Sequence, residues 1–304
     1  MGTSLIAGHL TCCLSIVEGL KVKVAIGFFD GVHLGHQAIL KGADAALTFR
    51  NHPLTVLAPE KAPRLIMSVE ERVAAIKACG VGEVTVLDFT PELAEMPADE
   101  FAASFLKRPG GRFPVLRCGA NWRFGKGGEG NAEWLRAKGI DVEVVPYAEY
   151  KGETVSSSRI RRCLEGGEIE DANAMLGRRF QVSGSRFQGK GLGGRIGYPT
   201  VNLKLETLNL KLPLGVYEVE VEGRKATANY GLAPTMGDRA WASPVLEVHL
   251  LDNRTIEQSE QSNNPIVSFV RFIRPEKKFD SVADLQRQIA ADCATIGTWT
   301  LPVF

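Results

Sequence analysis

No two of the six cysteines stand at the C-x-x-C spacing, and the six are scattered along 304 residues. Metal knuckles and dithiol redox sites use that spacing, and disulfide scaffolds are short chains that are dense in cysteine. We therefore expect free thiols in a reducing compartment, with neither a disulfide framework nor a cysteine-ligated metal.

Long apolar runs and an excess of one charge are also lacking. No run approaches the roughly 20 apolar residues that a transmembrane helix needs. No Lys or Arg precedes Lys21, so the positive segment of a secretory signal peptide is missing. The formal net charge of +1 gives no general attraction to nucleic acid or to a membrane surface. We expect a cytoplasmic protein with small-molecule partners, as a monomer or a weak homo-oligomer.

The pattern along the chain predicts two domains. Strands at 21–27, 84–87, 113–117 and 142–145 alternate with helical segments, which predicts a Rossmann-like parallel sheet with helices on both faces. From residue 180 the sequence changes to short alternating strands and a final helix begun by Ser281, which is typical of a small antiparallel β-barrel. We place the boundary between domains 1–179 and 180–304.

The first strand leads into a glycine-rich turn, Gly27-Phe28-Phe29-Asp30-Gly31-Val32-His33-Leu34-Gly35-His36-Gln37. A helix that starts here offers unpaired N–H groups to an anion, but its dipole supplies only about 0.3–1 kcal/mol per charge. Two imidazoles at the same helix entrance can add to the dipole and the N–H groups in binding a polyphosphate. A corner with two surface histidines is the alternative, and a zinc site lacks a third ligand at metal spacing.

Three other segments carry candidate chemistry. Ser156, Ser157, Ser158 and Arg161 stand at a predicted helix start, where hydroxyls and a guanidinium can bind phosphate or merely cap the helix. The loop 118–128 combines glycines with aromatic and basic residues, and either approaches a ligand or lies on the surface. The glycine loop 189–197 precedes Thr200 and Asn202, which can cradle phosphate and ligate Mg²⁺ or form only a hairpin.

The glycine-rich turn resembles a known signature. His-x-Gly-His after a strand is similar to the nucleotidyltransferase superfamily, and Phe29-Asp30-Gly31-Val32-His33-Leu34-Gly35-His36-Gln37 resembles the bacterial bifunctional riboflavin kinase/FAD synthetase family. Elements of that family follow in order, as Thr48-Phe49-Arg50-Asn51-His52-Pro53, Ser156–Arg161, Gly197-Tyr198-Pro199-Thr200-Val201-Asn202 and Asn229–Thr235. The resemblance extends over residues 21–295.

The resemblance implies two reactions. The C-terminal module phosphorylates riboflavin to FMN with ATP and Mg²⁺, and Glu247 is the general base. The N-terminal module transfers AMP from ATP to FMN, which gives FAD and pyrophosphate. It implies catalytic roles for His33, His36 and Glu247; ATP or phosphate contacts at Gly27, Phe28, Asp30, Gly35, Ser156, Ser157, Ser158, Arg161, Gly189, Gly191 and Gly193; flavin contacts at His52, Asn121, Trp122 and Phe124; and metal contacts at Thr200 and Asn202.

The chain departs from the family pattern at Arg50, at Asn121 and Trp122, and over residues 253–264, where a polar loop replaces a Tyr-Gly pair. The short spacing between His36 and Thr48 predicts a shortened first helix. A single-activity FMN adenylyltransferase with an inactive kinase-like domain, and a non-catalytic flavin- or nucleotide-binding protein, remain as alternatives. A nucleotidyltransferase for nicotinamide mononucleotide or a lipid head group fits His-x-Gly-His alone, but the kinase-like half does not support it.

Overall fold

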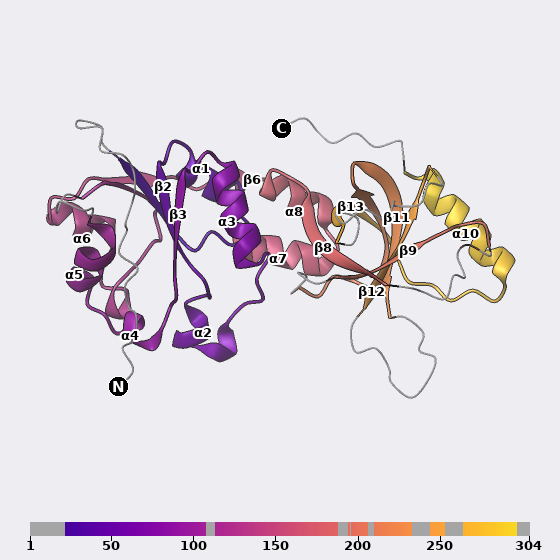
Figure 1. Cartoon of the computed structure of the whole chain (residues 1–304), viewed down its shortest axis with the longest axis horizontal. Helices are drawn as coiled ribbons and strands as arrows, with labels where there is room; N and C mark the ends of the chain where they lie inside the picture. Colours follow the sequence, from indigo (N-terminus) through magenta and orange to yellow (C-terminus); the bar gives the residue numbers. More distant parts are fainter. Residues whose placement is uncertain are drawn as a thin grey trace. The chain divides into compact units, whose positions relative to one another are not determined.

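A computed structural model of the chain describes residues 22–107, 113–187, 194, 196–205, 210–232, 244–252 and 264–296. The chain forms two compact units that divide between Ser156 and Ser157, and each unit is described by itself (Figure 1). Within the described ranges, every helix is too short or too polar to cross a lipid bilayer.

The first unit is built on a five-stranded sheet in which neighbouring strands run parallel, in the order β3-β2-β1-β4-β5. Its strands are β1 (Lys23–Ile26), β2 (Ala45–Phe49), β3 (Glu83–Leu87), β4 (Val115–Gly119) and β5 (Val142–Val145). The predicted parallel sheet is confirmed. The strand order reverses between β1 and β4, and ligands of such sheets bind beyond the carboxyl ends of the strands at that point.

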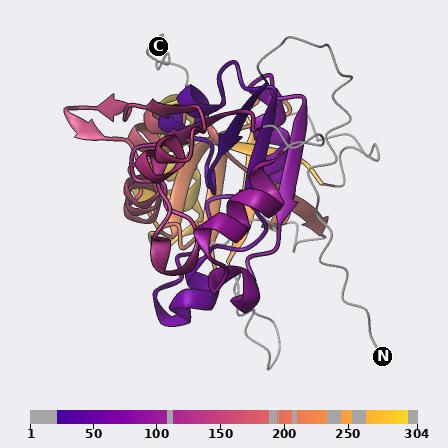
Figure 2. The same ribbon diagram turned by 90° about the vertical axis from the view of Figure 1, so that its left-hand side faces the viewer.

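Helices cover both faces of this sheet (Figures 1 and 2). Alternate residues of a strand face opposite sides, so Ala25 and Ala46 pack with α1 and α3 on one face. Ile26 and Leu47 pack with α5 and α6 on the other face. The helices are α1 (Leu34–Leu40), α2 (Leu54–Leu57), α3 (Val69–Ala78), α4 (Pro91–Ala94), α5 (Ala98–Phe101) and α6 (Ala132–Ala137), and a hairpin of β6 (Glu149–Tyr150) and β7 (Glu153–Thr154) ends the unit.

Local sequence signals set several helix ends. The Ser68 hydroxyl accepts the N–H of Glu71, and the Glu71 carboxylate accepts the N–H of Ser68, so the two residues form a capping box at the start of α3. Thr90 caps α4 ahead of a proline at its first position. Helix α1 has seven residues, which confirms the shortened first helix.

The second unit begins with α7 (Ser157–Gly166) and α8 (Ile169–Leu176) and continues as a closed barrel in the order β10-β11-β12-β9-β8-β13. All six pairs of neighbouring strands are antiparallel, and α10 (Val282–Ala294) follows the last strand, so the predicted barrel and terminal helix are confirmed. The strands are β8 (Phe180–Phe187), β9 (Val201–Leu205), β10 (Gly215–Val221), β11 (Arg224–Gly231), β12 (Val245–Leu250) and β13 (Ile266–Pro275).

Helix α8 lies against β8 and β13, and one of its buried side chains, Asn173, bonds to both strands. The Asn173 amide nitrogen donates to the Phe269 carbonyl at 2.9 Å, and its amide oxygen accepts the N–H of Phe180 at 2.6 Å. Helix α8 therefore packs with the barrel, and the boundary between residues 179 and 180 stays a prediction.

We predict that Asn173→Ala destabilises the second unit, because it leaves a buried N–H and a buried carbonyl without partners at about 1–3 kcal/mol each. Urea unfolding followed by circular dichroism measures the change. Gln181→Ala is the control, since the Gln181 amide only bonds Ser268 at an exposed position. Equal stability of the two variants would contradict the assigned role of Asn173.

Candidate active sites

The turn between β1 and α1 has an unusual backbone. Phe29, Gly31 and Val32 have φ angles of 58°, 82° and 39°. A left-handed conformation is costly for a β-branched residue such as Val32, and strain of this kind clusters at functional sites. The Phe29 and Val32 side chains are buried in the core, which offsets the strain. The turn therefore has a fixed shape at the carboxyl end of the central strand.

This turn brings the two predicted catalytic histidines into contact. His33 is the N-cap of α1, and its Nδ1 accepts the backbone N–H of His36 at 3.4 Å. The two rings stack with their centroids 3.6 Å apart. A Cβ at Gly35 would lie 3.2 Å from the His33 ring, and a Cβ at Gly27 would lie 2.9 Å from the Phe29 ring. Both glycines thus make room for the rings of the turn.

The His36 imidazole is held in its neutral form. Its Nδ1 is buried and has no hydrogen-bond partner in the described part of the chain. Burial lowers the pKa of His36 well below its ordinary value, and the nearby His33 and Arg72 lower that pKa further. A neutral imidazole offers one N–H donor and no net charge, so His36 is suited to hydrogen bonding rather than to charge neutralisation.

Arg72 of α3 also lies against this turn, and the sequence analysis did not identify it. Its side chain is 0% exposed, and its guanidinium lies 4.2 Å from the centre of the Phe28 ring. One nitrogen, Nη2, donates to the Phe49 carbonyl and, at 3.1 Å, to the Arg50 carbonyl at the carboxyl end of β2. Nε and Nη1 have no partner among the described residues. No motif marks Arg72, because its partners come from distant segments.

Residues after β2 gather around the same turn. The His52 and Phe28 rings meet in a T-shaped contact with centroids 4.9 Å apart, and His52 Nδ1 accepts the N–H of Leu54 at 3.1 Å. The Asp30 carboxylate is buried and accepts the N–H of Ile66. Asp30 therefore braces the chain ahead of α3, and its direct contact with nucleotide stays a prediction.

The loop after β4 supplies the predicted flavin contacts. Asn121 is exposed, and the half-buried Trp122 stacks on Phe124 with ring centroids 4.7 Å apart. Phe124 is itself buried and also meets the rings of Phe101 and Trp134. Phe124 is thus a core residue that supports Trp122, and its predicted flavin contact remains untested.

The serine-rich segment marks the division between the units. Helix α7 starts at Ser157, as predicted, and the Arg161 guanidinium donates to the Ser158 hydroxyl at 3.4 Å. Ser156 belongs to the first unit, whereas Ser157, Ser158 and Arg161 belong to the second.

Several residues named in the sequence analysis lie outside the described residues. They are the predicted phosphate contacts Gly189, Gly191 and Gly193, the loop residues Pro234 and Thr235, and the polar stretch 253–263.

The second unit places two predicted site residues, Asn202 and Glu247, in a row with Asn229 across three strands. Asn202 of β9 pairs with Glu247 of β12, and Glu247 pairs with Asn229 of β11. All three are half-buried. They alternate along their strands with fully buried apolar residues, namely Leu203, Ala228, Leu246 and Val248. The row therefore presents amide and carboxylate oxygens on the face opposite the barrel core.

Two residues, His249 and Glu276, affect the position and the charge of this row. The buried His249 ring contacts the Pro199 carbonyl through Nδ1 at 2.9 Å, which fixes the chain directly before Thr200. Burial raises the pKa of the Glu247 carboxyl, and the negative charge of Glu276 raises it further. A raised pKa makes Glu247 a stronger base than an exposed glutamate, which suits removal of a proton from a hydroxyl.

Comparisons with known proteins match the two halves of the chain separately. The family model of FAD synthetase matches residues 18–159, and that of riboflavin kinase matches residues 176–300. The relatives named bifunctional riboflavin kinase/FMN adenylyltransferase include that of Bacillus subtilis, 30% identical over 90% of this chain and 91% of its own length. The Listeria monocytogenes relative is 32% identical over 88% of this chain and 89% of its own length. The Escherichia coli K12 relative is 32% identical over 88% of this chain and 90% of its own length.

A solved structure is similar over nearly the whole chain. It is titled as a macrolide-efflux protein from Streptococcus pneumoniae and superimposes with a TM-score of 0.78 at 28% identity. The similarity covers 94% of this chain and 97% of that one. Its title differs from the names of the curated relatives, and the likeness supports the arrangement of elements within this chain.

We predict that His36 makes the protein less stable as the pH falls below about 6.5, the ordinary pKa of histidine. The folded pKa is lowered, so the unfolded chain binds the proton first. Stability present above the unfolded pKa is then lost toward acid pH, by at most about 1.4 kcal/mol per pH unit. Urea unfolding of wild type and His36→Gln from pH 7.5 to 5.5 measures this, and parallel pH curves for the two proteins would contradict it.

Proposed function

The chain belongs to the family of bifunctional riboflavin kinases/FMN adenylyltransferases, and on this basis we propose how its residues carry out the two reactions. It carries both enzyme modules and acts in flavin biosynthesis, forming FMN from riboflavin and FAD from FMN. The observation that carries the residue assignment is that each module holds one polar cluster built from the predicted residues. One cluster is the histidine pair of α1, and the other is the row of Asn202, Glu247 and Asn229.

In the adenylyltransferase module, a phosphate oxygen of FMN attacks the α-phosphorus of ATP. The new P–O bond forms as the bond to the bridging oxygen breaks, and pyrophosphate leaves. No protein nucleophile takes part. His33 and His36 donate hydrogen bonds to the phosphate oxygens, and the neutral state of His36 makes it a directional donor. Gly27, Phe28, Asp30 and Gly35 shape the turn of the first unit, and the phosphate contacts of Ser156, Ser157, Ser158 and Arg161 stay predictions.

The flavin of this module contacts His52, Asn121 and Trp122. Trp122 is the best supported of them, because Phe124 holds one face of the indole in place while the residue keeps exposed surface. Arg50, where the family usually has an acidic residue, forms an exposed ion pair with Asp88 at 2.8 Å. The charge at this departure is thus neutralised locally, which favours retained adenylyltransferase activity.

In the kinase module, Glu247 accepts the proton of the riboflavin 5′-hydroxyl as that oxygen attacks the γ-phosphorus of ATP, and ADP leaves. Thr200 and Asn202 would hold Mg²⁺, because hydroxyl and amide oxygens are ligands that suit this ion, and Asn202 lies beside the Glu247 carboxylate. When bound, the ion neutralises charge on the phosphates. Gly189, Gly191 and Gly193 cradle the phosphates. A cytoplasmic location and a monomeric or weakly associating chain remain predictions.

We predict that His36→Gln lowers FAD formation from FMN and ATP by about 10²-fold, the typical cost of one donor aimed at developing charge. Chromatography of the flavin products measures the rate. Riboflavin phosphorylation by the same preparation is the internal control and should stay within about twofold of wild type. A wild-type rate of FAD formation would exclude the histidine pair from catalysis.

We predict that Glu247→Gln lowers FMN formation from riboflavin by about 10²–10⁴-fold, because the amide cannot accept the hydroxyl proton. FAD formation from added FMN should persist and shows that the variant is folded. Loss of both activities together would indicate a folding defect, and Glu247→Asp then tests the assignment, since a carboxylate should recover part of the rate. Full kinase activity of Glu247→Gln would overturn it.

A further inference from the structure

One arginine of the first unit is directed at the carboxyl end of α1. Arg117 of β4 is 14% exposed at its side chain. Its Nε donates to the Ile39 carbonyl at 2.9 Å, and its Nη2 donates to the Ala38 carbonyl at 3.1 Å. Its Nη1 donates to the Glu143 carboxylate. All three nitrogens of the guanidinium therefore donate hydrogen bonds, and two of these bonds go to carbonyls of one helix.

Among the described residues, no backbone N–H outside the helix donates to either of these two carbonyls. The Gln37 carbonyl accepts the N–H of Lys41, and the Leu40 carbonyl accepts the N–H of Ala43. Arg117 takes the two carbonyls between them. The last four carbonyls of any helix lack partners within the helix, and a cation is favourable there. Arg117 thus completes the end of α1 from a neighbouring strand.

A helix as short as α1 depends on such contacts for its direction. It has seven residues, and isolated helices shorter than about 12 residues are marginal in water. Its axis is therefore set by packing and by the groups at its two ends. One end carries His33 and His36, and the other end is held by Arg117.

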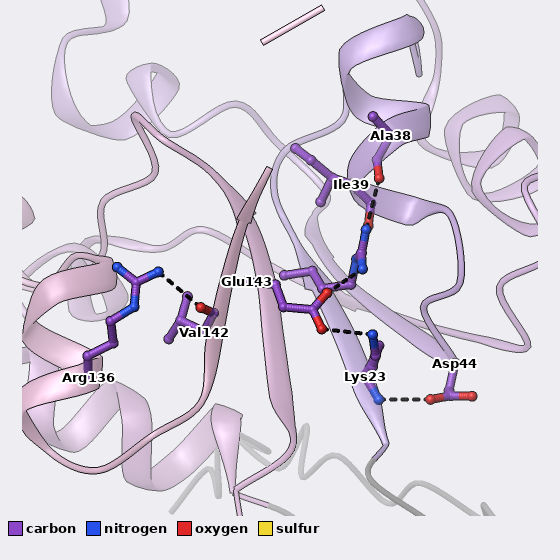
Figure 3. A network of polar contacts seen from close by, with 8 residues as sticks. Lys23, Ala38, Ile39, Asp44, Arg136, Val142 and Glu143 are labelled. Atoms are coloured by element: carbon purple, nitrogen blue, oxygen red, sulfur yellow. Dashed lines mark hydrogen bonds and ion pairs between the residues drawn. The ribbon is translucent and has the colours of Figure 1, made fainter. Parts of the chain in front are cut away.

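The guanidinium is itself held in place across three adjacent strands. Glu143 of β5 pairs with Arg117 in the sheet register and also accepts the ammonium of Lys23 of β1 at 2.7 Å. The backbone N–H of Lys23 donates to Asp44. Figure 3 shows Glu143 bonded to Lys23, with Ala38 and Ile39 farther along the same network of polar contacts. Fixed on both sides, Arg117 has little freedom to change its contact with α1.

We propose that Arg117 is a positioning residue for FMN adenylylation, which holds α1 at the angle that aims His33 and His36 at the reacting phosphates. This inference rests on the proposed role of the histidine pair. Arg117 does not act on the substrates itself. A displacement of reacting groups by about 1 Å can cost about 10²-fold in rate, so a small tilt of a seven-residue helix is sufficient.

The test compares Arg117→Met with two controls at a temperature where all variants are folded by circular dichroism. Arg136→Met removes a similar arginine whose Nη2 donates to the Val142 carbonyl at 3.0 Å without touching α1. Leu135→Ala removes a fully buried side chain from α6 and controls for lost stability. We expect Arg117→Met to lower kcat for FAD formation by about 10–100-fold. KM for ATP and FMN should change less than threefold, and both controls should keep kcat within threefold.

Arg117→Lys gives a second readout, since one ammonium can reach one carbonyl and should recover part of kcat. Riboflavin kinase activity should not change in any variant. The proposal is overturned if Arg117→Met keeps kcat within twofold of wild type, or if Leu135→Ala loses as much. If His36→Gln also keeps full activity, the proposed function of the histidine pair fails as well. If His36→Gln is inactive while Arg117→Met keeps full activity, the positioning role of Arg117 fails and the proposed role of the histidine pair stands.

Discussion

Two imidazole rings stacked 3.6 Å apart at the entrance of a short helix determine the character of the first site. The arrangement exists because the backbone turns through left-handed conformations at Phe29, Gly31 and Val32, which directs the chain from β1 into α1. Gly35 leaves space for one ring, and burial keeps the other ring neutral. The buried Phe29 and Val32 side chains hold the strained turn. The site is thus rigid before any substrate arrives, which is what electrostatic catalysis requires.

The second unit positions its polar side chains in a different way. Strand register, rather than a helix entrance, sets Asn202, Glu247 and Asn229 side by side. Their neighbours along each strand fill the barrel core, so the polar row cannot shift without disturbing the packing. Adenylyl transfer needs donors for phosphate oxygens and no base, whereas phosphorylation of a hydroxyl needs a carboxylate near metal ligands. Each unit offers the groups that its own reaction requires.

Much of the fold could be predicted from the sequence, because it follows from local rules. The pattern of strands and helices predicted the parallel sheet and the barrel, and a cap residue predicted the start of the final helix at Ser281. The candidate histidines and Glu247 were found from motifs. Arg72 and Arg117 were missed because they act on carbonyls 22 to 79 positions away in the sequence, where no short pattern records the contact. Sequence alone also could not show that Phe124 is a buried ring that supports Trp122, and its flavin contact stays a prediction.

The central claim is that both modules of this chain are active. Incubation of the purified protein with Mg-ATP and either riboflavin or FMN, followed by chromatography of the flavins, tests it most directly. The account predicts that riboflavin gives FMN and then FAD, and that FMN gives FAD with release of pyrophosphate. FAD from FMN with riboflavin unchanged would show a silent kinase module. Binding of both flavins without any product would contradict the account for both modules.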